Sequence, residues 1–182
     1  GSAAAPRPMA GMAGLNELLD LFAPFSFDRL FALMVFLGVL QPLFVFGIGR
    51  SLGLGRKAAF LVGIIIATSP LYIRLASSEL AFVPATTCLL AAVWLALEAG
   101  RRDEVFLLCA SALCVSLAGH FRPVLYTCIV PVMLGAWIRI EPDGRWTWFK
   151  RPGLWIAFGL YGLLTADDVG PILDAMGEGT AL

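Results

Sequence analysis

Two short polar breaks between apolar runs carry the side chains best suited to chemistry in this sequence. The first break holds Arg74 and Glu79, and the second holds His120 and Arg122. An arginine suits a phosphate group, because its planar fork donates two parallel hydrogen bonds to two oxygens. A carboxylate can accept a proton from an attacking hydroxyl. We therefore predict Glu79 as a catalytic residue and Arg74, His120 and Arg122 as substrate-binding residues for a lipid-linked phosphate.

Each of these residues also has a purely structural interpretation, which the sequence leaves open. Glu79 complements the dipole of a helix that begins just after its break, and Arg122 followed by Pro123 is typical of a helix start. Arg74 lies where a long side chain can reach lipid headgroups from an apolar helix end. The choice depends on the elements that hold these residues.

Other kinds of site are poorly represented. The glycine-rich basic segment at residues 49–57 lacks the Gly-Lys-Ser/Thr ending of a phosphate loop. The chain has one histidine and no elbow motif around a serine, which argues against a serine nucleophile. The cysteines lie in apolar runs without C-x-x-C spacing, which predicts small buried side chains and no metal site: Cys88, Cys109, Cys114 and Cys128. We predict no cofactor.

The composition places these residues in a membrane protein. Of 182 residues, 59% are hydrophobic and 14% charged, and the mean hydropathy is +0.86. An average soluble domain is roughly 45–50% apolar and about 25% charged. A soluble enzyme, a disordered tail, a secreted disulfide scaffold and a nucleic-acid binder are therefore disfavoured, and membrane lipid is the expected partner.

Six apolar runs separated by charged breaks predict the helices. The first run has twenty uncharged residues, about 30 Å of helix, which is enough to cross the hydrocarbon core of a bilayer. Pro42 within it predicts a kink rather than a helix end. The runs cover residues 30–49, 58–73, 80–97, 105–119, 124–138 and 153–166. The predicted fold class is an all-α, polytopic transmembrane helix bundle of about six spans.

An amphipathic helix is predicted before the first run. Apolar side chains recur there at helical spacing: Leu15, Leu18, Leu19 and Phe22. This helix suits the plane of the membrane interface, with a packed helix of a small outer domain as the alternative. The predicted organisation is an outer-face segment at residues 1–28 with this helix, a transmembrane bundle at 29–166 and an acidic outer-face tail at 167–182.

The charged residues are sorted between alternate breaks. The breaks at residues 50–57, 98–104 and 139–152 contain nine of the thirteen Lys and Arg residues. By the positive-inside rule these breaks are cytoplasmic, and the breaks at 74–79 and 120–123 and both chain ends are extracytoplasmic. The net charge is then about +4 on the cytoplasmic side and −4 on the other.

The order of these elements resembles the bacterial GT-C class of integral-membrane glycosyltransferases. The likeness covers roughly residues 13–140. An interfacial helix is followed by a span that ends at residues 47–54 (GIGRSLGL), and then by a span that begins RKAA at 56–59 and closes TSPL at 68–71. An outer Ser-Glu turn and a later Arg-Pro turn come next. The class includes protein mannosyltransferases and aminoarabinose transferases.

The resemblance implies an enzyme that transfers a sugar from a polyprenyl-phosphate donor to an acceptor at the extracytoplasmic face of the bacterial inner membrane. In similar proteins the main catalytic acid lies in a first outer loop, which would precede residue 1. The resemblance therefore implies a fragment in which Glu79 is a second outer-loop acid and Arg122 contacts phosphate. The alternatives are a transporter or flippase subunit and a non-catalytic membrane scaffold.

Overall fold

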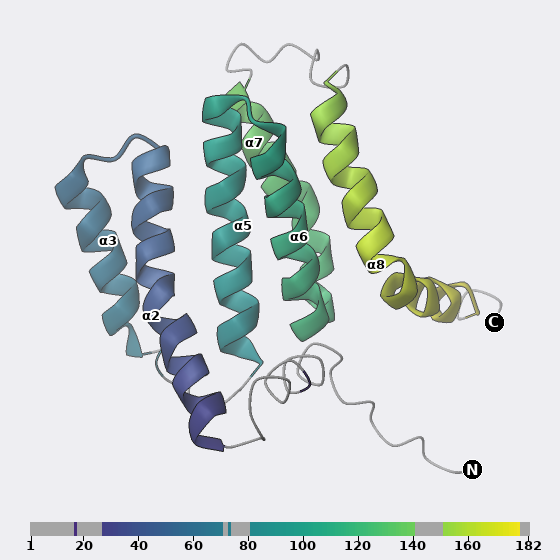
Figure 1. Cartoon of the computed structure of the whole chain (residues 1–182), viewed down its shortest axis with the longest axis horizontal. Coiled ribbons are helices and arrows are strands. Elements are labelled where there is room, and N and C mark those ends of the chain that lie inside the picture. The colour runs from purple at the N-terminus through teal and green to yellow at the C-terminus, as the bar shows by residue number, and fades with distance from the viewer. Residues whose placement is uncertain (1–16, 18–26, 71–72, 74–80, 141–150, 179–182) are drawn as a thin grey trace.

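The chain is all-α in the part that the structure describes. The computed structural model describes residues 17, 27–70, 73, 81–140 and 151–178 (Figure 1). These residues are 91% helical and include no strand. The order of elements is α2 (Phe27–Ser51), α3 (Arg56–Thr68), α5 (Phe82–Arg102), α6 (Val105–Phe121), a 3-10 helix η1 (Pro123–Cys128), α7 (Ile129–Ile140) and α8 (Pro152–Glu178). The predicted all-α class is confirmed.

Short turns with matching residue types join successive helices. Gly53, between α2 and α3, has a φ of 91°, which glycine adopts without a Cβ clash. Asp103 ends α5 in a left-handed conformation, and α6 begins two residues later. Arg122 is extended and ends α6, because a residue before proline disfavours the helical conformation. The chain reverses direction at each of these turns.

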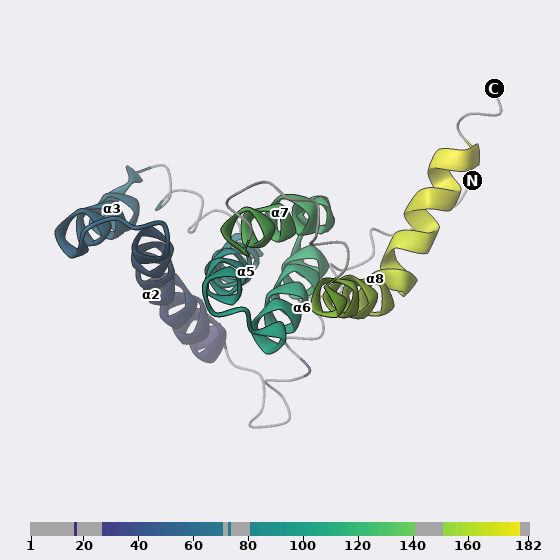
Figure 2. The same cartoon turned by 90° about the horizontal axis from the view of Figure 1, so that it is seen from above.

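Neighbouring helices therefore lie side by side and alternate in direction (Figure 1). Helices α2 and α3 form one edge, α5, α6 and α7 lie together in the middle, and α8 packs on α6 at the other side (Figure 2). The turns at residues 52–55 and 103–104 and the start of α8 lie at one end, which we call the basic end. The α6–η1 junction and the starts of α2 and α5 lie at the opposite end, the Arg122 end. The two ends thus coincide with the alternate breaks between which the sequence sorts its charges.

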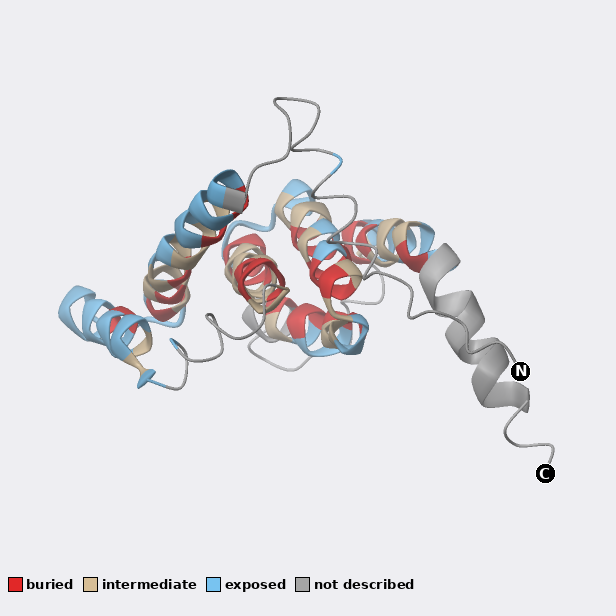
Figure 3. Cartoon of the chain, turned by 90° about the horizontal axis from the view of Figure 1, so that it is seen from below, coloured by how far each residue is buried: buried red, intermediate tan, exposed pale blue. Residues whose placement is uncertain are grey.

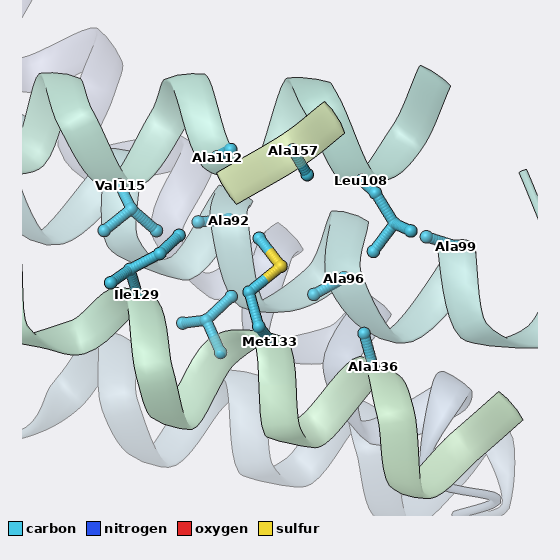
Figure 4. Packing of buried hydrophobic residues seen from close by; sticks show 11 residues of the cluster. Ala92, Ala96, Ala99, Leu108, Ala112, Val115, Ile129, Met133, Ala136 and Ala157 are labelled. Carbon is cyan, nitrogen blue, oxygen red and sulfur yellow. The ribbon is translucent and has the colours of Figure 1, made fainter. Parts of the chain in front are cut away.

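Small side chains form the core where α5, α6, α7 and α8 meet (Figure 4). Six of its eleven buried residues are alanines: Ala92, Ala96, Ala99, Ala112, Ala136 and Ala157. Alanine lets helix backbones approach closely, which maximises dispersion contacts between them. A separate cluster of Leu30, Met34 and Val83 packs α2 on α5. The tightest packing is therefore between α5 and its neighbours on the α6 side.

Large apolar side chains cover much of the outside of the bundle. On α2, Phe31 is 70% exposed and Val39 62% exposed. Ile65 of α3, Phe106 of α6 and Leu163 of α8 are exposed by 65%, 80% and 77%. Figure 3 shows α3 and the outer side of α2 largely exposed, with buried residues facing inward. A water-soluble monomer rarely exposes continuous apolar surface of this kind.

The observed helices differ from the predicted runs in length and shape. Helix α3 stops at Thr68, because Ser69 precedes Pro70 and is extended, whereas the prediction continued to residue 73. The predicted run at 124–138 begins as the tight turn η1 before it becomes α7. Helix α2 continues through Pro42, as predicted.

Among the residues that the structure describes, two helices are long and apolar enough to cross a membrane by length and composition, Asp28–Ser51 and Phe82–Arg102. Shorter apolar helices are Val105–Phe121, Pro123–Ala136 and Pro152–Ala166. The predicted interfacial helix at residues 15–22 lies outside the described residues except for Glu17, which is helical and exposed.

Candidate functional site

The structure describes two of the four predicted site residues, and it brings them to the Arg122 end of the bundle. His120 lies in the last turn of α6, and Arg122 is the extended residue that follows this helix. Both side chains are half-buried. Glu79 and Arg74 lie outside the described residues. The candidate site is therefore built here from His120, Arg122 and the side chains that contact them.

Tyr126 of η1 is the main partner of His120. The Nδ1 atom of His120 lies 2.5 Å from the hydroxyl oxygen of Tyr126. The two rings meet edge to face, with centroids 5.9 Å apart and planes at 82°. Either group can donate in this contact, depending on which imidazole nitrogen carries the proton. Tyr126 is 8% exposed, so the surrounding protein shields this side of the pair from solvent.

Gly119 makes the space in which the Tyr126 ring sits. A Cβ atom at residue 119 would lie only 2.2 Å from two carbons of that ring. Pro123 begins η1, and the tight 3-10 turn brings Tyr126 back over the end of α6. The glycine before the histidine and the proline after the arginine thus cooperate to place the tyrosine hydroxyl on the imidazole.

Arg122 contacts the first residue of α5. Its guanidinium carbon lies 5.7 Å from the centre of the Phe82 ring, within the range of a cation–π interaction. This contact joins the α6–η1 junction to the start of α5, although forty residues separate them in sequence. The guanidinium is thereby held over one aromatic face at the start of α5.

Helix α8 completes the support of this end. The Tyr161 hydroxyl donates a hydrogen bond of 2.7 Å to the backbone carbonyl of Tyr126. Tyr126 is thereby held through its ring by Gly119, through its hydroxyl by His120 and through its backbone by Tyr161. Sequence reasoning missed Tyr126 and Tyr161, because neither stands in a polar break. Only the return of the chain in η1 brings Tyr126 to His120.

Two polar networks inside the bundle were also missed. Fully buried Gln41 directs Nε2 toward α5, at 2.9 Å from the Thr86 hydroxyl and 2.8 Å from that of Thr87. At the basic end, the Ser51 hydroxyl donates a 2.6 Å hydrogen bond to Oε1 of Glu98. These contacts link α2 to α5. The side chains that make them lie in the interior of the bundle rather than on its surface.

The acidic and sulfur side chains of the described residues form no metal centre. No group of three or more His, Cys, Asp or Glu residues converges within the described ranges. The four cysteines are half-buried free thiols on α5, α6 and η1. Donor groups at the candidate site are thus an imidazole, a phenol and a guanidinium, a set suited to an anionic oxygen ligand.

Comparison with protein-family models, curated proteins and solved structures finds no match for this chain.

Proposed function

We propose that this chain is an integral membrane protein whose helices form a polytopic transmembrane bundle. The observation that supports this most directly is the outer surface of large, exposed apolar side chains on α2, α3, α6 and α8. In water this surface would drive aggregation, whereas in a bilayer it contacts acyl chains at no cost. The shorter helices cross with the help of arginines at their ends and local bilayer thinning.

The proposed orientation puts the basic end in the cytoplasm. Arg50, Arg56 and Lys57 lie in and beside the α2–α3 turn, and Arg101 and Arg102 end α5 at the same end. The positive-inside rule assigns such an end to the cytoplasm. The Arg122 end is then extracytoplasmic, and with it both chain termini.

At the Arg122 end we propose transfer of a sugar from a polyprenyl-phosphate donor to an acceptor hydroxyl. The acceptor oxygen bonds to the anomeric carbon, and the bond from that carbon to the phosphate oxygen breaks. The polyprenyl phosphate leaves with the bonding electrons, and the hydroxyl proton passes to a carboxylate, for which Glu79 is the candidate. Arg122 and Arg74 bind the donor phosphate, and His120 with Tyr126 hydrogen-bonds to its oxygens or to the sugar.

Support for this role comes from the contacts of Arg122. Its cation–π contact with Phe82 holds the guanidinium beside the start of α5. Glu79 precedes Phe82 by three residues, a chain length that spans at most about 11 Å between Cα atoms. This chain length allows the Glu79 carboxylate to reach the Arg122 end, as the proposal requires.

The test is sugar transfer by the protein expressed from its complete gene in membrane vesicles, with a radiolabelled polyprenyl-phosphate sugar. Glu79→Gln is expected to lower kcat by about 100-fold or more, the usual contribution of a positioned general base. Arg122→Gln is expected to raise the KM for the donor, and Arg122→Lys to restore part of the loss. Arg50→Gln, which removes an exposed cation at the basic end, is the matched control and should leave both constants unchanged.

Full transfer by both Glu79→Gln and Arg122→Gln would refute the catalytic assignment. A protein that remains in the membrane after alkaline extraction but transfers no sugar would favour the transporter or scaffold alternatives. A protein released by alkaline extraction would refute the membrane assignment itself.

A further inference from the structure

A groove lies between α2 and α3, at the edge of the bundle that faces away from α6 and α8 (Figure 2). Its volume is about 450 Å³. Leu43 and Phe46 of α2 form one wall, and Phe60, Ile64 and Ala67 of α3 form the other. Helix α3 packs chiefly on α2 and lies at the edge of the described part of the bundle (Figure 2).

The two helices meet at the base of this groove through a glycine. Gly63 is buried, and a Cβ atom there would lie 3.0 Å from the carbonyl oxygen of Pro42. This close contact between the two backbones forms the base of the groove, and the longer side chains on each side of it form the walls. The groove is therefore a product of the helix crossing.

Two cations stand at the end of the groove nearest the basic end. Arg56 and Lys57, the first residues of α3, line it together with the apolar walls. Both side chains are exposed, and neither has a hydrogen-bond or ion-pair partner among the described residues. Arg101, Arg102 and Arg151, by contrast, pair with Glu98 or Asp103. The charge of Arg56 and Lys57 is thus left for a ligand outside the described chain.

The length of the groove matches one leaflet of a bilayer. Residues 57, 60, 64 and 67 recur at helical spacing on one face of α3. From residue 57 to residue 67 the helix rises about 15 Å at 1.5 Å per residue, half of a hydrocarbon core of about 30 Å. An acyl chain that enters at the cations therefore ends near the middle of the membrane.

We propose that this groove binds one anionic phospholipid from the leaflet at the basic end, with its headgroup phosphate on Arg56 and Lys57 and an acyl chain against α3. The inference rests on the membrane assignment above and not on sugar transfer. Two free cations select a net negative headgroup over a zwitterionic one, by about fivefold each and about 30-fold together. The lipid fills the side of α2–α3 that the protein leaves open.

The test is native mass spectrometry of the full chain in detergent, with phosphatidylglycerol or phosphatidylcholine of identical acyl chains as the probe. We expect the first phosphatidylglycerol to bind about 30-fold more tightly than phosphatidylcholine. Arg56→Gln with Lys57→Gln should bring the two affinities together, and each single change should cost about fivefold. Ala67→Phe, which enlarges an exposed side chain in the groove, should weaken both lipids.

The matched control is Arg50→Gln with Arg101→Gln, which removes two exposed cations from the same end without touching the groove and leaves Arg102 on Glu98. This control should keep the preference for phosphatidylglycerol, and circular dichroism should show equal helix content in every variant. Equal affinities in the original chain, or the same loss in the control, would overturn the proposal. A dimer that forms through α2–α3 and excludes lipid would overturn it as well.

Failure of this proposal is distinguishable from failure of the proposed function. A chain that resists alkaline extraction yet shows no headgroup preference refutes the lipid site and leaves the membrane assignment standing. A chain that alkaline extraction releases refutes both. Arg122→Gln should leave the preference unchanged, because it changes the other end of the bundle.

Discussion

At the scale of single residues, the packing of the Arg122 end depends on the lack of a side chain at Gly119. Gly119 has no Cβ atom, so the Tyr126 ring lies directly on the end of α6. This seat brings the tyrosine hydroxyl to His120 Nδ1. The geometry of the imidazole–phenol pair therefore follows from a glycine in a helix, where glycine by itself is unfavourable.

Gly119→Ala should destabilise the protein, although the same change usually stabilises a helix. The added methyl group meets the Tyr126 ring at 2.2 Å, and such overpacking costs about 1–3 kcal/mol. Thermal unfolding in detergent, followed by circular dichroism, measures the change. The control is Gly159→Ala in α8, where a Cβ atom meets nothing within 4 Å and a gain of about 0.5–1 kcal/mol is expected. Equal shifts in Tm for the two variants would contradict the packing of the Tyr126 ring on Gly119.

At the scale of elements, two kinds of contact hold the helices together. Helices α5, α6, α7 and α8 share the alanine-rich core, in which close backbones supply dispersion contacts. Helix α2 is attached to α5 differently, through a small apolar cluster, the contact between the Phe44 and Trp94 rings, and polar networks around Gln41 and around Glu98. Polar contacts between helices fix their register, because a one-turn slip would leave buried groups unpaired.

Ser51→Ala should loosen α2 from α5. The Ser51 hydroxyl donates to Glu98, which is 9% exposed, so its loss leaves a buried carboxylate oxygen without that donor. We expect a loss of about 1–2 kcal/mol in the free energy of unfolding in mixed micelles. A double-mutant cycle with Glu98→Gln should give a coupling energy of about 1 kcal/mol. Thr68→Ala is the control, since among the described residues that hydroxyl bonds within its own helix. Additive effects of Ser51→Ala and Glu98→Gln would refute the link.

At the scale of the whole molecule, the bundle has an apolar exterior and two chemically different ends. The basic end collects Arg and Lys from three separate breaks, and the ion pair between Arg151 and Asp103 joins two of them. The Arg122 end carries the aromatic, imidazole and guanidinium contacts. For the membrane protein proposed above, the positive-inside rule predicts one orientation, with the basic end in the cytoplasm.

Cysteine labelling in sealed membrane vesicles should show this orientation. Gly55→Cys lies at the basic end in open space with a φ of −58°, and Val124→Cys lies at the other end, where residue 124 is 70% exposed. In a background without the native cysteines, a membrane-impermeant maleimide should label Val124→Cys in right-side-out vesicles and Gly55→Cys in inverted ones. Labelling of both from the same side would rule out the proposed topology.

The helices were largely predictable from the sequence, and the site only in part. Apolar runs and charged breaks identify the positions of α2, α5 and α6 and the start of α8, because the spacing of charges along a chain is a local property. Helix α8 continues to Glu178, however, beyond the predicted run that ends at residue 166. The apolar run predicts α3 as far as residue 73, but Pro70 disfavours the helical conformation at Ser69, and the helix ends at Thr68. His120 and Arg122 were recognisable by residue type, whereas Tyr126 and Phe82 resembled ordinary apolar side chains.

By itself, the sequence determined the all-α class, the approximate boundaries of α2, α5 and α6 and the separation of charge between alternate breaks. The tertiary structure decided which faces meet: alanines between α5 and its neighbours, Gln41 against two threonines, Tyr126 on His120, and a groove between α2 and α3 that ends at Arg56 and Lys57. The reason is physical. Helix formation and charge placement depend on residues a few positions apart, but packing depends on side chains that forty or more positions separate, and only the folded chain brings these into contact.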